Sequence, residues 1–111
     1  MKRITSALVT ALLLASHQAS AAPVWTAYTT VTTVEVINDG GFLVTLASGV
    51  GSTCTAANAI YVQAGFNGVS ADGAKALLAT ALSAFYLKQS IRFQYDDSTP
   101  YCYATYAGMT N

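Results

Sequence analysis

The sequence predicts a mainly β protein with one helix, in the element order β-β-β-α-β-β, on the basis of three patterns. Residues 24–37 are rich in Val, Thr, Tyr and Trp, side chains that fit a pleated sheet. Between Ala71 and Leu87, apolar residues recur at intervals of three and four, which is typical of an amphipathic helix. Residues 90–95 alternate between polar and apolar side chains, which is typical of a strand with one buried face.

Residues 1–21 have the three-part pattern of a secretory signal peptide. Lys2 and Arg3 precede an apolar run at residues 7–15, and small residues lead to Ala21. The run is shorter than the roughly 20 residues that cross a bilayer, which favours a cleaved leader over the alternative of a retained membrane anchor. Cleavage leaves residues 22–111 as a single small domain with no membrane span. We therefore expect an exported protein, either periplasmic or secreted.

Removal of the leader leaves few charges and no histidine. Three cations, Lys75, Lys88 and Arg92, remain against five acidic residues, so no basic patch is expected and nucleic acid is not an expected partner. The single histidine, His17, leaves with the leader, which excludes histidine-dependent nucleophiles and histidine metal sites. We expect a protein that is not an enzyme, with no catalytic residue and no cofactor.

Asp96 and Asp97 are adjacent and would point to opposite sides of an extended chain, which is a poor arrangement for a paired acid and base. Turn formation through hydrogen bonds to the backbone is their expected role. A weak calcium site is the alternative, but it requires about six to eight oxygen ligands, more than this turn offers. No metal-binding residue is therefore assigned.

Three strands are expected before the helix, covering residues 24–37, 42–47 and 59–63. The first is long and bent. Asp39 is followed by Gly40 and Gly41, which favours a tight hairpin because glycine accepts a positive φ, and the second strand should run antiparallel to the first. A loop of small residues at positions 48–53 then leads to Cys54.

Cys54 and Cys102 are the two cysteines of the chain, and both follow the leader. In an oxidising compartment this pair is expected to form one disulfide rather than two free thiols. On the chain-entropy account it would stabilise the fold by roughly 4 kcal/mol. A redox-active role is the alternative, but the C-x-x-C spacing is missing.

The helix is expected to begin after Ser70, a suitable N-cap, and to carry Asp72 in its first turn. Its apolar stripe consists of Ala74, Leu77, Leu78, Ala81, Leu82 and Phe85. The other face carries mostly small side chains: Lys75, Ala76, Ala79, Thr80 and Ser83. Two explanations stand: the helix is buried on two sides within its own domain, or this face meets another copy of the chain.

The last strand is expected at residues 101–109. Alternation places Tyr101 and Tyr103 on one face, and Cys102, Ala104 and Tyr106 on the other. We therefore expect Tyr106, like Tyr95 of the preceding strand, to face the core.

Seven tyrosines and one tryptophan are a notable content for so short a chain. Tyrosine combines an apolar ring with a hydroxyl, a combination that suits sugars and protein interfaces. Tyr101 and Tyr103 are the candidate ligand-binding residues.

The element order is that of the OB-type barrel, in which a helix lies between the third and fourth of five strands. An α+β antiparallel sheet with one packed helix is the alternative fold.

The run from Gly68 to Cys102 resembles the helix-strand segment of the B subunits of bacterial AB-type toxins, particularly the subtilase cytotoxin group. The resemblance rests on K-x-L-L-x-x-A-L-S-A at Lys75–Ala84, followed by a short polar joint and an alternating strand. It implies a secreted, disulfide-containing OB-type protein that forms a homopentameric ring, lined by its helices, and binds host-cell glycans. None of the family's sugar-contacting residues is carried over to this chain. The alternative function is a stand-alone exported protein that binds a bacterial protein partner, as an inhibitor or envelope factor.

Overall fold

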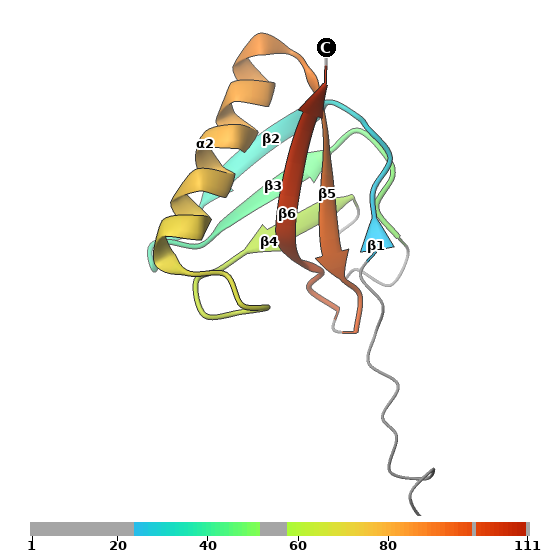
Figure 1. Ribbon diagram of the computed structural model, residues 1–111. Helices are drawn as coiled ribbons and strands as arrows, with labels where there is room; N and C mark the ends of the chain where they lie inside the picture. The colour runs from blue at the N-terminus through green and yellow to red at the C-terminus, as the bar shows by residue number, and fades with distance from the viewer. Residues whose placement is uncertain (1–23, 52–57, 99, 111) are drawn as a thin grey trace, which may run out of the picture.

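The computed structural model describes residues 24–51, 58–98 and 100–110, which form a six-stranded mixed sheet and one helix (Figure 1). The mainly β class with a single helix is thus confirmed for these residues. The elements are β1 (Val24–Trp25), β2 (Val31–Val36), β3 (Phe42–Leu46), β4 (Ala59–Val62), α2 (Ala71–Leu87), β5 (Ser90–Asp96) and β6 (Tyr103–Thr110). The predicted leader and Cys54 lie outside the described residues.

The strand order in the sheet is β1-β5-β6-β4-β3-β2, so β1 and β2 are the two edge strands of an open sheet. Neighbouring strands are antiparallel except β4 and β6, which run parallel. The sheet is therefore mixed, unlike the purely antiparallel sheet of the alternative fold. The helix connects β4 to β5 and packs against β2 and β6 (Figure 1).

The single long first strand that the sequence predicts is in fact two strands, so the sheet has six strands rather than five. β1 and the residues after it follow β5: the amides of Thr26 and Thr29 donate to the carbonyls of Phe93 and Ile91, each at 2.9 Å. From Val31 onward the chain pairs with β3 instead. This change of partner interrupts the strand, and a composition favourable to strands throughout gives no sign of it.

The hairpin between β2 and β3 forms as predicted. The Ile37 amide donates to the Gly41 carbonyl at 2.7 Å, and the Gly40 amide donates to the Ile37 carbonyl at 3.0 Å. Gly40 has φ of +93°, which a side chain would oppose. The turn thus fixes the register that pairs Val34 with Val44.

The helix occupies the predicted residues, because its first turn is set locally. The Ser70 hydroxyl oxygen accepts a hydrogen bond from the Gly73 amide at 3.0 Å, and Asp72 lies in the first turn. At the other end, Lys88 adopts a left-handed conformation and its amide donates to the Ala84 carbonyl. Both ends are therefore capped within the chain.

The apolar stripe of α2 packs on the sheet, with Ala74, Ala81 and Ala84 buried. The face of small residues is not buried: Lys75, Ala76, Ala79 and Ser83 are exposed and Thr80 is half-buried. The explanation that the helix is covered on two sides within its own chain is therefore wrong, because no other described element packs on this face. The other explanation, that this face contacts a second copy of the chain, stays a prediction.

The core lies between α2 and the concave side of the sheet. Its largest fully buried side chains are Phe42, Phe93, Leu46, Ile60, Ile91, Val44, Val62 and Cys102. Cys102 is fully buried and the described residues include no free cysteine, but the predicted pairing with Cys54 stays a prediction. Within the described ranges, no helix has the length and apolar character needed to cross a membrane.

Candidate functional site

A β-bulge in β6 determines which residues line the candidate site. Gln94 pairs with Tyr106, but the next residue of β5, Tyr95, pairs with Ala104, so Thr105 is an extra residue without a partner. Ala104, just before the bulge, faces the core, and Ala107 beyond it also packs against the core. These two inward-facing residues are three positions apart, an odd number, so the alternation of inward and outward side chains changes phase at Thr105.

The bulge turns Tyr106 outward, where 62 % of its surface is exposed. The prediction that Tyr106 faces the core is therefore wrong. The same prediction for Tyr95, which lies on the strand without the extra residue, is confirmed by an exposure of 2 %. A bulge is a property of the pairing between two strands, and neither sequence neighbour of Thr105 is a glycine or proline that would have indicated it.

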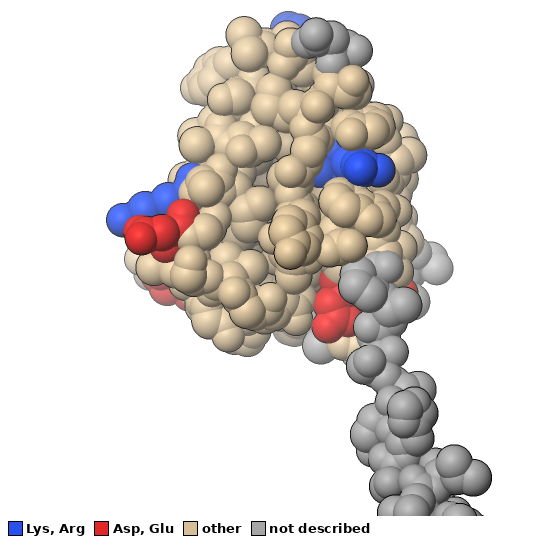
Figure 2. All heavy atoms as spheres, viewed as in Figure 1, with Lys and Arg blue, Asp and Glu red and all other residues tan. Residues whose placement is uncertain are grey.

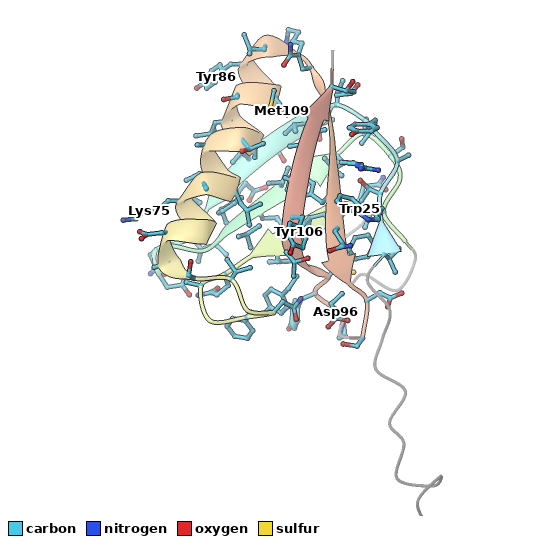
Figure 3. The ribbon with its side chains drawn as sticks, in the orientation of Figure 1. Trp25, Lys75, Tyr86, Asp96, Tyr106 and Met109 are labelled. Atoms are coloured by element: carbon cyan, nitrogen blue, oxygen red, sulfur yellow. The ribbon has the colours of Figure 1, made fainter. Side chains whose placement is uncertain are left out.

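Tyr106 forms one wall of an open pocket of about 490 Å³ between the N-terminal end of α2 and the β5–β6 pair. In Figure 3, Tyr106 stands in front of β6. The pocket is lined by Asn67, Gly68, Val69, Ser70, Gly73, Leu77, Gln94, Thr105 and Tyr106. None of these residues is charged, and the set combines one aromatic ring with hydroxyl and amide groups.

The polar groups of the pocket are held by hydrogen bonds within the chain. The Thr105 hydroxyl donates to the side-chain oxygen of Gln94 at 3.2 Å. The side-chain nitrogen of Asn67 donates to the Tyr103 carbonyl at 2.9 Å. The Ser70 hydroxyl oxygen accepts from the Gly73 amide. These side chains are thus oriented before any ligand arrives, which lowers the entropic cost of binding.

Tyr101 and Tyr103, the candidates chosen from the sequence, lie in a second cluster together with Tyr61 and Phe66. Their ring centroids are 6.0 Å apart, and the Tyr61 centroid is 5.6 Å from that of Tyr101. Phe66 stacks on Tyr103 at 4.7 Å, so one face of the Tyr103 ring is already covered. Phe66 and Tyr101 remain exposed. The four rings form an aromatic cluster that does not line the pocket, and its role as a ligand surface stays a prediction.

Where the structure shows their contacts, the acidic side chains accept hydrogen bonds from other groups of the chain. The Asp96 carboxylate accepts a hydrogen bond from the Ser98 amide at 2.8 Å, as expected of a turn-forming residue. In the described parts of the chain, no three His, Cys, Asp or Glu side chains are grouped as metal ligands would be.

Comparisons with protein-family models, with curated proteins and with solved structures give no match for this chain.

Proposed function

We propose that this chain is an exported, non-enzymatic binding module with an OB-like barrel, and that its pocket beside Tyr106 binds a saccharide. The single observation that carries the proposal is the uncharged pocket formed where the bulge turns Tyr106 outward next to preorganised amide and hydroxyl groups.

The topology supports the OB-like part of the proposal. The two edge strands, β1 and β2, are consecutive in the chain, and Thr29 between them bridges to Ile91 of β5. One short segment therefore links both edges of the sheet, which brings it near closure. The helix lies between the third and fourth long strands and packs against both β2 and β6, the position of the helix in an OB-type barrel.

The chemistry of the pocket supports the ligand class. A sugar ring has an apolar face, which stacks on an aromatic ring, and hydroxyl groups, which require hydrogen-bond donors and acceptors. Tyr106 supplies the ring, while Gln94 and Thr105 supply amide and hydroxyl groups on the same wall. The volume of about 490 Å³ lies in the range of small-molecule sites.

The test is a glycan array probed with mature, oxidised protein, followed by calorimetry on the best ligand. We expect Tyr106→Ala to weaken binding by roughly tenfold, about 1.4 kcal/mol, because it removes the stacking surface. Val36→Ala is the control, since Val36 is exposed on β2 and does not line the pocket. Equal affinity of wild type and Tyr106→Ala would contradict the site. A loss in Tyr101→Ala instead would move the site to the aromatic cluster.

We propose further that the chain associates with copies of itself through the exposed face of α2, in a ring such as the homopentamer that the toxin resemblance implies. What supports this is the exposed run of Ala76, Ala79 and Ser83, because small side chains let a neighbouring element approach closely.

The alternative function is binding of a bacterial protein partner. The aromatic cluster around Tyr103 favours it, because exposed aromatic rings are enriched at protein interfaces. Absence of any saccharide ligand, together with a specific envelope protein captured by wild type but not by Tyr101→Ala, would favour this alternative.

A further inference from the structure

The guanidinium group of Arg92 lies close to two aromatic rings on the outer side of the sheet. Its Cζ atom lies 4.1 Å from the centroid of the Trp25 ring and 5.0 Å from that of the Tyr28 ring. Both residues are exposed, Trp25 at 42 % and Tyr28 at 45 %. We refer to Trp25, Arg92 and Tyr28 as the arginine clamp.

The clamp leaves hydrogen-bonding capacity unused. The Nε atom of Arg92 is buried and has no hydrogen-bond partner in the described residues. A guanidinium stays charged at any working pH, and its donors lie in its plane, so an aromatic ring over its face does not occupy them. Arg92 is thus a charged group with one donor, Nε, that the described residues leave without an acceptor.

The clamp adjoins the proposed saccharide pocket. Gln94 pairs with Trp25 on one side and with Tyr106 on the other, so these three residues form one cross-strand row. Arg92 precedes Gln94 by two residues and therefore projects from the same side of β5, about 7 Å along the strand. In Figure 3, Trp25 and Tyr106 lie to either side of β5.

The residue opposite Arg92 on β6 is Gly108, which has no side chain to cover the clamp. A Cβ atom at this position would lie 3.7 Å from the Tyr28 hydroxyl and 3.9 Å from Arg92 Nε. Any longer side chain would therefore begin to fill the surface next to the guanidinium.

We infer that the ligand bound beside Tyr106 is a saccharide that carries an oxyanion, and that this oxyanion docks on the arginine clamp. The inference rests on the proposed function. A planar guanidinium binds carboxylate and sulfate oxygens in pairs, so the carboxylate of a uronic acid and a sulfate ester are the two sources of this chemistry. Around β5 and β6, Figure 2 shows acidic side chains only at the lower end, where Asp96 ends β5, so a cationic contact above it would favour a charged ligand over a neutral one.

The experiment compares three matched probes by calorimetry: a neutral galactose oligosaccharide, the corresponding galacturonate and the corresponding 6-sulfate. We expect wild type to bind at least one charged probe ten times more tightly than the neutral one. The preferred charged probe identifies carboxylate or sulfate as the source. Arg92→Gln should abolish the preference while retaining neutral binding, and Lys75→Gln should keep it, since Lys75 lies on α2 away from the clamp.

Neutral binding without any preference in wild type would overturn this inference and leave the proposed function standing, whereas no binding of any probe would overturn both. A preference that survives in Arg92→Gln would also overturn it. If Arg92→Gln does not fold, Arg92→Lys keeps the charge without the planar fork and should reduce the preference several-fold. An unchanged preference in Arg92→Lys would then show that the clamp acts only by fastening β1 to β5.

Discussion

Asp39 closes the turn between β2 and β3 with its side chain. Its carboxylate accepts hydrogen bonds from the Gln63 side-chain nitrogen and from the Gly41 amide, each at 3.0 Å. The Gln63 bond, and after it the Gly41 bond, lowers the pKa of Asp39 below its ordinary value. The ionised form is therefore the one that fits the folded turn.

We predict that Gln63→Ala raises the pKa of Asp39 toward its ordinary value. A carboxyl whose pKa is lower in the folded state stabilises the fold above its unfolded pKa, and this contribution is lost as the pH falls through the folded pKa. Gln63→Ala removes part of this pH-dependent stabilisation. The free energy of unfolding of the variant should therefore fall less steeply in acid than that of wild type. NMR titration of the Asp39 carboxyl measures the shift, with Thr33→Ala, an exposed change on β2, as control. An identical Asp39 titration in wild type and Gln63→Ala would contradict the prediction.

The helix α2 is the element whose limits are most clearly determined by its own residues. Its start depends on one hydroxyl, because Ser70 satisfies the Gly73 amide, which has no partner inside the helix. Its end depends on the left-handed conformation of Lys88. The β6 strand is the opposite case, since its bulge at Thr105 exists only in relation to β5.

We predict that Ser70→Ala lowers the free energy of unfolding by about 1 kcal/mol, because the Gly73 amide loses its acceptor. Chemical denaturation of the mature protein measures the change. Ser70→Asn should retain most of the stability, since asparagine caps equally well. Ser83→Ala is the matched control: the Ser83 hydroxyl donates to the Ala79 carbonyl within the helix, and alanine suits that position. Equal losses in Ser70→Ala and Ser83→Ala would show that the cap contributes nothing.

At the scale of the whole molecule, the helix lies against one side of the sheet and turns a face of small residues to solvent. The single chain has no further described element to cover this face, which contains Ala76, Ala79 and Ser83. Polar residues with long side chains are more usual on such a surface.

We predict that the mature, oxidised protein is a homo-oligomer, with a mass near five times that of the monomer by light scattering coupled to size exclusion. Ala79→Glu should return it to the monomer, because a charged side chain cannot be accommodated where two copies meet closely. Ala47→Glu is the control, as Ala47 is exposed beside the end of β3 and away from α2. A monodisperse wild-type monomer at high concentration would contradict self-association and return the helix to a purely structural role.

The sequence by itself determined the elements that depend on neighbouring residues. These are the helix from Ala71 to Leu87 with its Ser70 cap, the hairpin at Gly40, and the alternation of β5 that buries Tyr95. Each follows from the periodicity or the backbone preference of a short stretch, and a short stretch carries that information itself.

Only the tertiary structure decided which strand each segment pairs with, and the candidate site depends on that choice. The first strand divides because its two halves pair with different strands, and Tyr106 faces outward because Thr105 has no partner on β5. The same pairing places Trp25, Gln94 and Tyr106 in one row. Pairing joins residues far apart in the chain, and a one-residue shift moves a side chain to the opposite face at no cost to the local pattern. For that reason the sequence indicated tyrosines as ligand-binding residues and selected the aromatic cluster, whereas the pocket beside Tyr106 became visible only in the folded chain.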